Sequence, residues 1–115
     1  MADDPTTSLV NAFNRAWNDH DLDRALSLVT DDCVFESTAP APDGETFEGK
    51  DALARAWDPV FADLRSHFDL EDMALVGDTV VQRWRYTWGD GHVRGVDVIT
   101  VRDGLIAAKR SYVKG

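Results

Sequence analysis

The sequence predicts a single α+β domain in which a mainly antiparallel sheet packs against three N-terminal helices. The first half of the chain contains the segments with helical periodicity, and residues 67 to 113 read as four strands in succession. A chain of 115 residues is long enough for one domain with one hydrophobic core. We therefore expect the domain to span residues 7 to 115, after a disordered tail of residues 1 to 6.

Two helices are expected at the start of the domain. The first runs from Thr7 to Asn18, because apolar side chains recur there at helical spacing. Asp21 is a suitable N-cap for the second helix. The apolar stripe of this second helix reaches Val29, and we expect the helix to end at Asp31-Asp32.

Two short strands enclose a loop in the middle of the chain. Residues 33 to 37 and residues 46 to 48 are strand-like. Residues 38 to 45 contain two prolines and a Pro-Asp-Gly turn, which is typical of a loop.

A third helix follows, beginning near Lys50 or Asp51. Pro59 lies within its apolar stripe, and proline lacks the N–H that a helix interior needs. We therefore expect either a kink at Pro59 or a new helix start capped by Asp58.

Composition and charge exclude several classes of function. The net charge of −9 argues against nucleic acid and anionic membranes, because phosphate binding needs clustered Lys and Arg. No apolar run approaches the ~18 residues of a membrane span, and we find no signal peptide, so we expect a cytoplasmic protein. Cys33 is the only cysteine, which excludes an internal disulfide. The histidines show no metal-ligand spacing and the glycines no nucleotide fingerprint, so no metal or other cofactor is expected.

The last three strands carry the most informative pattern. Asp90-Gly91 and Asp103-Gly104 are hairpin turn signals between runs of β-branched and aromatic residues. Alternation places Trp84 and Tyr86 on one face and arginines on the other. A two-residue turn at Asp90-Gly91 puts Asp97 opposite Trp84, on the aromatic face. A carboxylate on an apolar face is costly unless it is paired, protonated or used in chemistry.

The chain resembles the nuclear transport factor 2-like superfamily, and within it the SnoaL-like and ketosteroid-isomerase-like proteins. The resemblance covers nearly the whole chain and is carried by residues 13 to 32, residues 47 to 50 and residues 95 to 113. It implies a cone-shaped α+β barrel with a curved sheet, a pocket between helices and sheet, and a homodimer through the outer face of the sheet. The superfamily contains isomerases, cyclases, epoxide hydrolases, dehydratases and non-catalytic binding domains, so the fold does not give the function.

The resemblance carries over one of three isomerase catalytic positions. Asp97 matches the protonated aspartic acid that hydrogen-bonds the developing enolate in ketosteroid isomerase, an enzyme that is itself a standard example of a neutral catalytic carboxyl group. The isomerase tyrosine falls at Phe13 and its general-base aspartate at Ser37, with Glu36 beside it. The steroid isomerase reaction as such is therefore not expected. Lys114 stands where epoxide hydrolases of this fold place an acid, so that chemistry is not supported either.

Two interpretations of Asp97 stay open. It is either a working acid or ligand-binding group, or a structural ion pair. A two-residue turn at Asp103-Gly104 puts Arg110 opposite Asp97, whereas a three-residue turn puts Lys109 there. Either cation holds Asp97 ionised, which makes it a poor proton donor but leaves it able to act as a base.

Glu36 and the histidines are weaker candidates. Strict alternation places Glu36 on a solvated edge, but a β-bulge would rotate it inward as a second carboxylate. Ser37 is expected to line a pocket and not to react. For His67, at a helix-to-strand junction, a cap or surface role outweighs catalysis, and His20 and His92 are expected to be solvated turn residues.

We thus predict a pocket for a small apolar or cyclic carbonyl compound, with Asp97, Glu36 and Lys109 as catalytic candidates. The predicted pocket-lining residues are Phe13, Trp17, Ser37, Trp57, Trp84 and Tyr86, although aromatic residues at such spacings are usually core. One interpretation is a cofactor-free acid/base enzyme that isomerises, cyclises or dehydrates its substrate. The other is a non-catalytic binding or dimerisation module in which Asp97 is merely paired.

Overall fold

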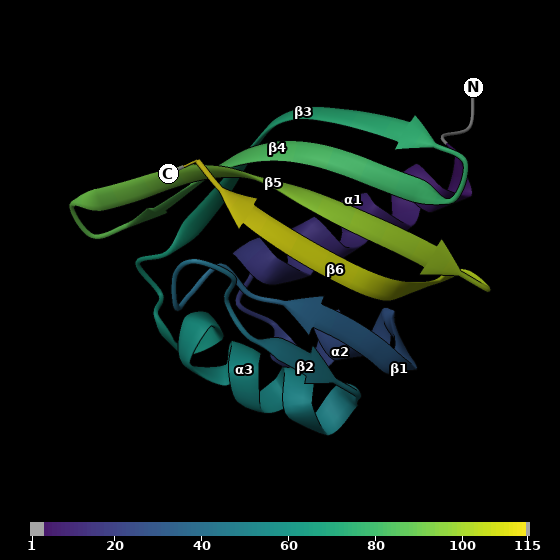
Figure 1. Ribbon diagram of the computed structural model, residues 1–115, viewed down its shortest axis with the longest axis horizontal. Coiled ribbons are helices and arrows are strands. Elements are labelled where there is room, and N and C mark those ends of the chain that lie inside the picture. Colours follow the sequence, from purple (N-terminus) through teal and green to yellow (C-terminus); the bar gives the residue numbers. More distant parts are fainter. Residues whose placement is uncertain (1–3, 115) are drawn as a thin grey trace.

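The computed structural model describes residues 4 to 114 and shows three helices against one six-stranded sheet (Figure 1). The predicted α+β architecture is confirmed. The helices are α1 (Pro5–Asn18), α2 (Leu22–Ser27) and α3 (Lys50–Ala62). The strands are β1 (Val29–Glu36), β2 (Thr46–Glu48), β3 (His67–Val76), β4 (Thr79–Trp88), β5 (Gly91–Arg102) and β6 (Leu105–Val113).

The helices begin and end for identifiable reasons. Helix α1 begins at Pro5, two residues before the predicted start, because the Asp4 side chain accepts a hydrogen bond from the backbone N–H of Thr6 and proline suits the first helical position. Residues 1 to 3 of the expected tail lie outside the described residues. Asp21 caps α2 as predicted, through a bond from the N–H of Arg24.

The predicted end of the second helix was wrong, and the structure excludes one of the two alternatives for the third helix. Helix α2 ends at Ser27, and Asp31-Asp32 belong to strand β1 instead of closing the helix. Helix α3 continues through Pro59 to Ala62, so no new helix starts at Asp58.

The sheet has the strand order β2-β1-β6-β5-β4-β3. Neighbouring strands are antiparallel except β1 and β6, which run parallel. The sheet curves around α1 but does not close, so the expected barrel is an open one (Figure 1). The parallel β1–β6 pair brings the first strand of the chain beside the last, and with it α3 over the same end of the sheet.

The register differs from the prediction at both hairpins. The β4–β5 turn is formed by Gly89 and Asp90, so Asp97 lies opposite Gln82 and Trp84 lies opposite Gly95. Gly89 adopts the left-handed region with φ +48°, which glycine tolerates. The shift is two residues, so Trp84 and Asp97 still share the predicted face.

The second hairpin contains a β-bulge that the turn signal does not reveal. Its turn at Asp103-Gly104 is the two-residue one of the two alternatives, and both residues have positive φ. Beyond it, Val101 pairs with Ile106 but Thr100 pairs with Ala108, so Ala107 is an extra residue on β6. Neither Lys109 nor Arg110 therefore lies directly opposite Asp97 on the neighbouring strand. Ser111 does.

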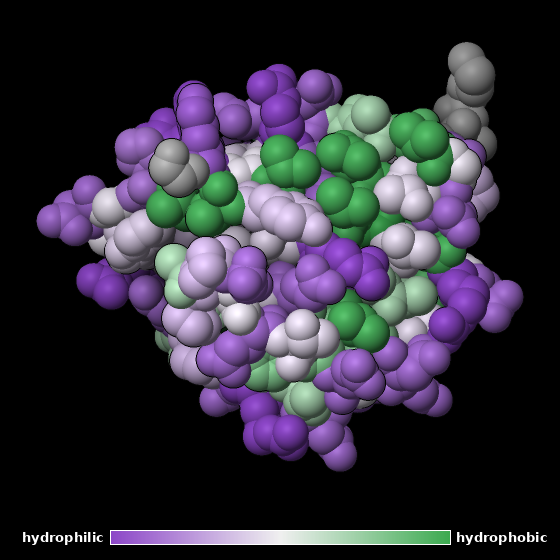
Figure 2. Space-filling view, viewed as in Figure 1, coloured by the Kyte–Doolittle hydropathy of each residue, from purple (hydrophilic) through white to green (hydrophobic). Residues whose placement is uncertain are grey.

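The core lies between the concave face of the sheet and helices α1 and α3. Its fully buried side chains include Val10, Phe13, Leu53, Trp57 and Ile99. The opposite face of the long strands is partly apolar: exposed apolar side chains gather over β3 to β6 among charged ones (Figure 2). Within residues 4 to 114 no helix is both long and apolar enough to cross a membrane.

Candidate functional site

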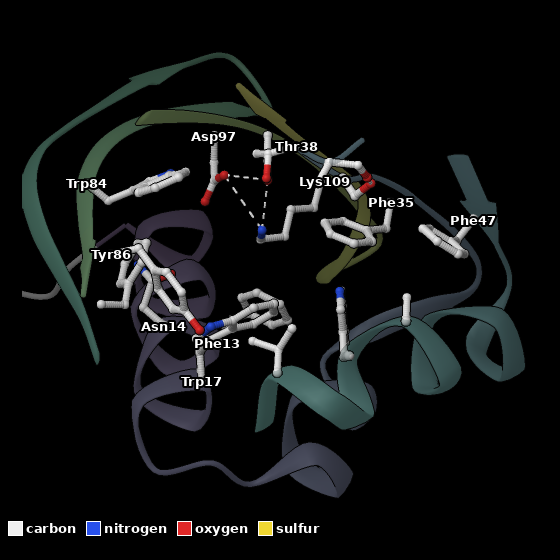
Figure 3. Close-up of a pocket in the computed structure, with 17 residues that line it drawn as sticks. Phe13, Asn14, Trp17, Phe35, Thr38, Phe47, Trp84, Tyr86, Asp97 and Lys109 are labelled. Atoms are coloured by element: carbon white, nitrogen blue, oxygen red, sulfur yellow. Dashed lines mark hydrogen bonds and ion pairs between the residues drawn. The ribbon is translucent and has the colours of Figure 1, made fainter. Parts of the chain in front are cut away.

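A cavity of about 330 Å³ opens between α1, α3 and the inner face of the sheet. All six predicted lining residues border it: Phe13, Trp17, Ser37, Trp57, Trp84 and Tyr86. Phe35 and Phe47 add further aromatic surface from β1 and β2. Figure 3 shows these side chains converging from both layers on one space. The cavity is within the range of ligand-sized pockets.

The aromatic wall is held in place by its own contacts. The centre of the Trp57 ring lies 5.6 Å from the ring centre of Phe13, 5.3 Å from that of Trp17 and 5.4 Å from that of Phe35. The ring planes meet at a steep angle in each pair. Edge-to-face contacts of this kind stabilise aromatic pairs. The wall is thus preformed by residues on α1, α3 and β1.

Three polar side chains on β5 and β6 form the opposite end of the cavity. The hydroxyl of Ser111 donates to Asp97 Oδ1 over 2.7 Å, and Lys109 Nζ donates to Ser111 Oγ over 3.0 Å. Lys109 Nζ is also 3.6 Å from Asp97 Oδ1. All three residues are buried yet line the cavity. The β-bulge at Ala107 makes this possible, because it turns Lys109 and Ser111 to the inner face together.

The surroundings of Asp97 are those of an ionised carboxylate. Every polar contact it makes comes from a donor: Ser111 on Oδ1, Gln82 Nε2 on Oδ2 at 3.0 Å, and the nearby ammonium of Lys109. Hydrogen bonds to the charged form favour that form. Lys109 is stabilised as a cation in turn, with Nζ 4.8 Å from the ring centre of Trp17 and 5.0 Å from that of Phe35. Asp97 therefore has the features of a base.

Gln82 connects this carboxylate to helix α1. Its amide forms a reciprocal pair with Asn14, in which Asn14 Nδ2 donates to Gln82 Oε1 at 2.8 Å and Gln82 Nε2 donates to Asn14 Oδ1 at 3.1 Å. Asn14 also lines the cavity. Sequence reasoning missed Asn14, Gln82 and Ser111 as site residues. Gln82 lies two residues before Trp84, so alternation places it on the same face, but only the observed register brings it opposite Asp97.

Glu36 and Ser37 are not placed for chemistry in this cavity. The side chain of Glu36 accepts a 3.0 Å hydrogen bond from Arg110 Nε and does not line the aromatic pocket, so no bulge brings it beside Asp97. Ser37 lines the pocket, but its hydroxyl is used by the loop. It donates to Ala39 O at 2.8 Å and accepts from the N–H of Glu45 at 3.0 Å.

The histidines and the cysteine have other roles. His20 is not solvated as expected: its ring nitrogens lie 3.0 Å from Phe61 O and 3.0 Å from Ser66 O, which ties the end of α1 to the segment after α3. His67 pairs with Asp69 on the exposed edge strand. Burial raises the pKa of the Cys33 thiol to about 11, so this cysteine is a poor nucleophile. Residues 4 to 114 contain no cluster of side chains suited to a metal ion.

Comparison with known proteins agrees with this architecture. Residues 10–109 match the model of the SnoaL-like domain. The chain belongs to the SnoaL-like domain family. A search of curated proteins gave no match for this SnoaL-like protein.

Solved structures show the same fold over the whole SnoaL-like domain. A nuclear transport factor 2-like protein of unknown function from Mesorhizobium loti is 37% identical with a TM-score of 0.88, covering 100% of this chain and 98% of that one. A computationally designed 17-OHP binder is 25% identical with a TM-score of 0.84, covering 98% and 93%. A Mycobacterium tuberculosis protein is 25% identical with a TM-score of 0.84, covering 97% and 92%.

Proposed function

We propose that this protein binds a small, mostly apolar carbonyl compound and transfers a proton from the carbon next to the carbonyl group, without a cofactor. The observation that carries the proposal is a buried Asp97 that lines an open aromatic cavity while all of its polar partners are donors. An apolar wall with a few convergent polar groups suits a ring compound with one polar end.

The polar end of the cavity supports separate roles for Lys109 and Asp97. A substrate carbonyl oxygen near Lys109 Nζ would place the adjacent carbon near Asp97, because the two groups are 3.6 Å apart. Asp97 takes the proton, the electron pair forms the enolate double bond, and the negative oxygen is stabilised by the ammonium. Return of the proton to another carbon is isomerisation. Attack of the enolate carbon on a second carbonyl is cyclisation, and loss of a β-hydroxyl group is dehydration.

In this proposal Asp97 is a base, not the proton donor that the family resemblance suggested. Its partners are all donors, so a protonated carboxyl would lose bonds that the ionised form makes. Glu36 is left out because it pairs with Arg110 outside the pocket.

Hydrogen exchange with solvent tests the proposal without knowledge of the natural substrate. The protein is incubated with 2-tetralone, a bicyclic ketone, in D₂O, and loss of the α-hydrogens is followed by NMR. We expect Asp97→Asn to lower the rate by roughly 100-fold or more, whereas Glu36→Gln leaves it unchanged. Equal rates for Asp97→Asn and the wild type would contradict the base role.

A non-catalytic ligand-binding module is the second candidate. It is favoured by the buried pairing of Asp97 with Lys109 and by the similarity to a designed 17-OHP binder. Quenching of the tryptophan fluorescence by 2-tetralone reports binding, because Trp17, Trp57 and Trp84 line the cavity. Binding without any α-hydrogen exchange would select this alternative.

We also propose a homodimer through the outer face of the sheet. Exposed Tyr112 lies opposite Val96 on this face, and half-buried Val81 and Val98 pair with each other beside them, which supports an interface there. Sedimentation equilibrium measures the mass in solution. A monomer at high concentration would exclude the dimer.

A further inference from the structure

We propose that Gln82, oriented by Asn14, is a positioning residue that fixes the Asp97 carboxylate for proton abstraction. This inference rests on the proposed role of Asp97 as a base. Gln82 is fully buried, lies directly opposite Asp97 on the neighbouring strand, and donates to Asp97 Oδ2 at 3.0 Å. A buried glutamine among apolar side chains is costly unless its amide is fully bonded.

The amide of Gln82 has only one arrangement that satisfies all its partners. Nε2 carries two hydrogens, and they go to Asn14 Oδ1 and Asp97 Oδ2. Oε1 accepts from Asn14 Nδ2. Turning the amide over would place Oε1 against the carboxylate, where two acceptors repel each other. The ionised Asp97 and the orientation of Gln82 therefore support each other.

The two carboxylate oxygens are thereby given different surroundings. Oδ1 accepts from Ser111 and lies near Lys109, so its charge is already neutralised in part. Oδ2 accepts only from Gln82 in the residues described and keeps a lone pair. Figure 3 shows the carboxylate of Asp97 projecting from the sheet into the cavity, with one oxygen directed toward Lys109 and the other turned away from it. Oδ2 is accordingly the atom that takes the substrate proton, and Gln82 holds it in place.

Two substitutions at position 82 separate positioning from mere packing. Gln82→Leu removes the hydrogen bond to Asp97 and replaces the amide with an apolar side chain of similar size. Gln82→Glu keeps the shape but sets a second carboxyl group against Asp97, and two such groups in contact cannot both ionise. Asn14→Ala is the third variant, because it removes the hydrogen bonds that orient the Gln82 amide. Asn14 is a half-buried helix residue, so this substitution is expected to disturb folding least.

Asn18 provides the matched control. It lies one turn beyond Asn14 on α1, and its amide makes two 2.8 Å hydrogen bonds to the backbone of Phe68. These bonds do not involve Asp97. Asn18→Asp therefore disturbs a comparable amide on the same helix, beside cavity-lining Phe68, so it measures lost stability and a loosened cavity wall without any change at Asp97.

The readout is 2-tetralone exchange over a range of pH. We expect Gln82→Leu to lower kcat roughly 10- to 100-fold with KM within about 2-fold, because hydrogen bonds to charged groups are strong. We expect the pH profile of Gln82→Glu to move to higher pH, Asn14→Ala to show a smaller loss in kcat, and Asn18→Asp to keep the wild-type profile. Superimposable profiles for Gln82→Glu and the wild type would overturn the inference, as would losses no greater than that of Asn18→Asp.

A second measurement keeps this test separate from the proposed function. The carboxyl carbon resonance of Asp97, assigned with Asp97→Asn, reports its ionisation by NMR without any substrate. At pH 7 we expect the resonance in Gln82→Glu to move toward that of a protonated carboxyl, and the resonance in Asn18→Asp to stay in place. If the wild type exchanges no α-hydrogens, the proposed function fails, and an unmoved resonance in Gln82→Glu would overturn the positioning role independently.

Discussion

Lys109 and Arg110 are consecutive residues of one strand, and each pairs with a carboxylate in a different setting. Lys109 Nζ is 3.6 Å from Asp97, and the two side chains are 10% and 1% exposed. Arg110 Nε is 3.0 Å from Glu36, and these side chains are 38% and 35% exposed. The pair with the shorter distance is the exposed one. A short ion pair therefore does not distinguish the candidate site here; burial beside a cavity does.

The two ion pairs are expected to differ most in the free energy of unfolding that is lost when one partner of each pair is replaced. Lys109→Met leaves the Asp97 carboxylate buried without its cation, and we expect a loss of about 3–5 kcal/mol in the free energy of unfolding. The double variant Lys109→Met/Asp97→Leu should recover much of that loss. Urea unfolding measures both. A loss for Lys109→Met no larger than that for Arg110→Met would erase the contrast between the two pairs.

Cys33 extends the comparison to strand β1, where it faces inward and Glu36 is half-exposed. Burial raises the pKa of its thiol to about 11 in the folded protein. Because folding raises the thiol pKa, the neutral buried thiol contributes its full share of stability below pH 9, the pKa of the thiol in the unfolded chain. That share is lost as the pH rises toward 11. Two pKa units correspond to about 2–3 kcal/mol.

The measurement is the free energy of unfolding between pH 8 and pH 11 for the wild type and for Cys33→Ala. We expect the wild type to lose more stability than the variant over this range, since other groups that titrate there are common to both. Parallel curves would show that the thiol is not shielded as its burial indicates.

Gly95 tests how closely the buried side is packed. A Cβ atom at this position would lie 2.3 Å from Tyr112 O and 2.6 Å from the ring of Trp84. We expect Gly95→Ala to cost about 1–3 kcal/mol and to shift the Trp84 emission spectrum. Gly77→Ala is the control, because its Cβ would meet nothing within 4 Å while its φ of +62° isolates backbone strain. An unshifted spectrum in Gly95→Ala would show that the Trp84 ring moves away from the new methyl group without a change in its surroundings.

The smallest effect is expected at the exposed pair. Glu36→Gln should change the free energy of unfolding by about 0–1 kcal/mol, and the change should shrink as salt is added. Lys109→Met should depend much less on salt. Unfolding in low and high sodium chloride measures both, and equal salt dependence would mean that the two pairs share one electrostatic environment.

Alternation in the sequence predicted most of the fold and the membership of the aromatic wall. Strand faces follow from a period of two, so Trp84 and Tyr86 share a face in any register, and Asp97 joins them in any hairpin register that differs from the true one by an even number of residues. Helical spacing placed Phe13 and Trp57 toward the same interior. These features depend on local pattern, which is why they survive an error of two residues in the hairpin.

The polar end could not be predicted, because it depends on register. Gly89-Asp90 and Asp90-Gly91 are both acceptable turns, and only the first places Gln82 opposite Asp97. Nothing in the local sequence announces that Ala107 is an extra residue. Asn14 is a further case, since it contacts Gln82 across 68 positions of sequence.

The bulge at Ala107 also has a genetic consequence. Strict alternation from buried Ile106 would turn Ala108 and Arg110 inward, but the extra residue turns Lys109 and Ser111 inward instead. Loss of the Ala107 codon would leave a regular hairpin in which Ser111 is still opposite Asp97, whereas loss of the bulge with Ala107 kept would place Arg110 there. A relative that lacks this one residue can therefore keep the same side chains facing inward, and an alignment that closes the gap in the wrong place would compare residues from opposite faces of the sheet.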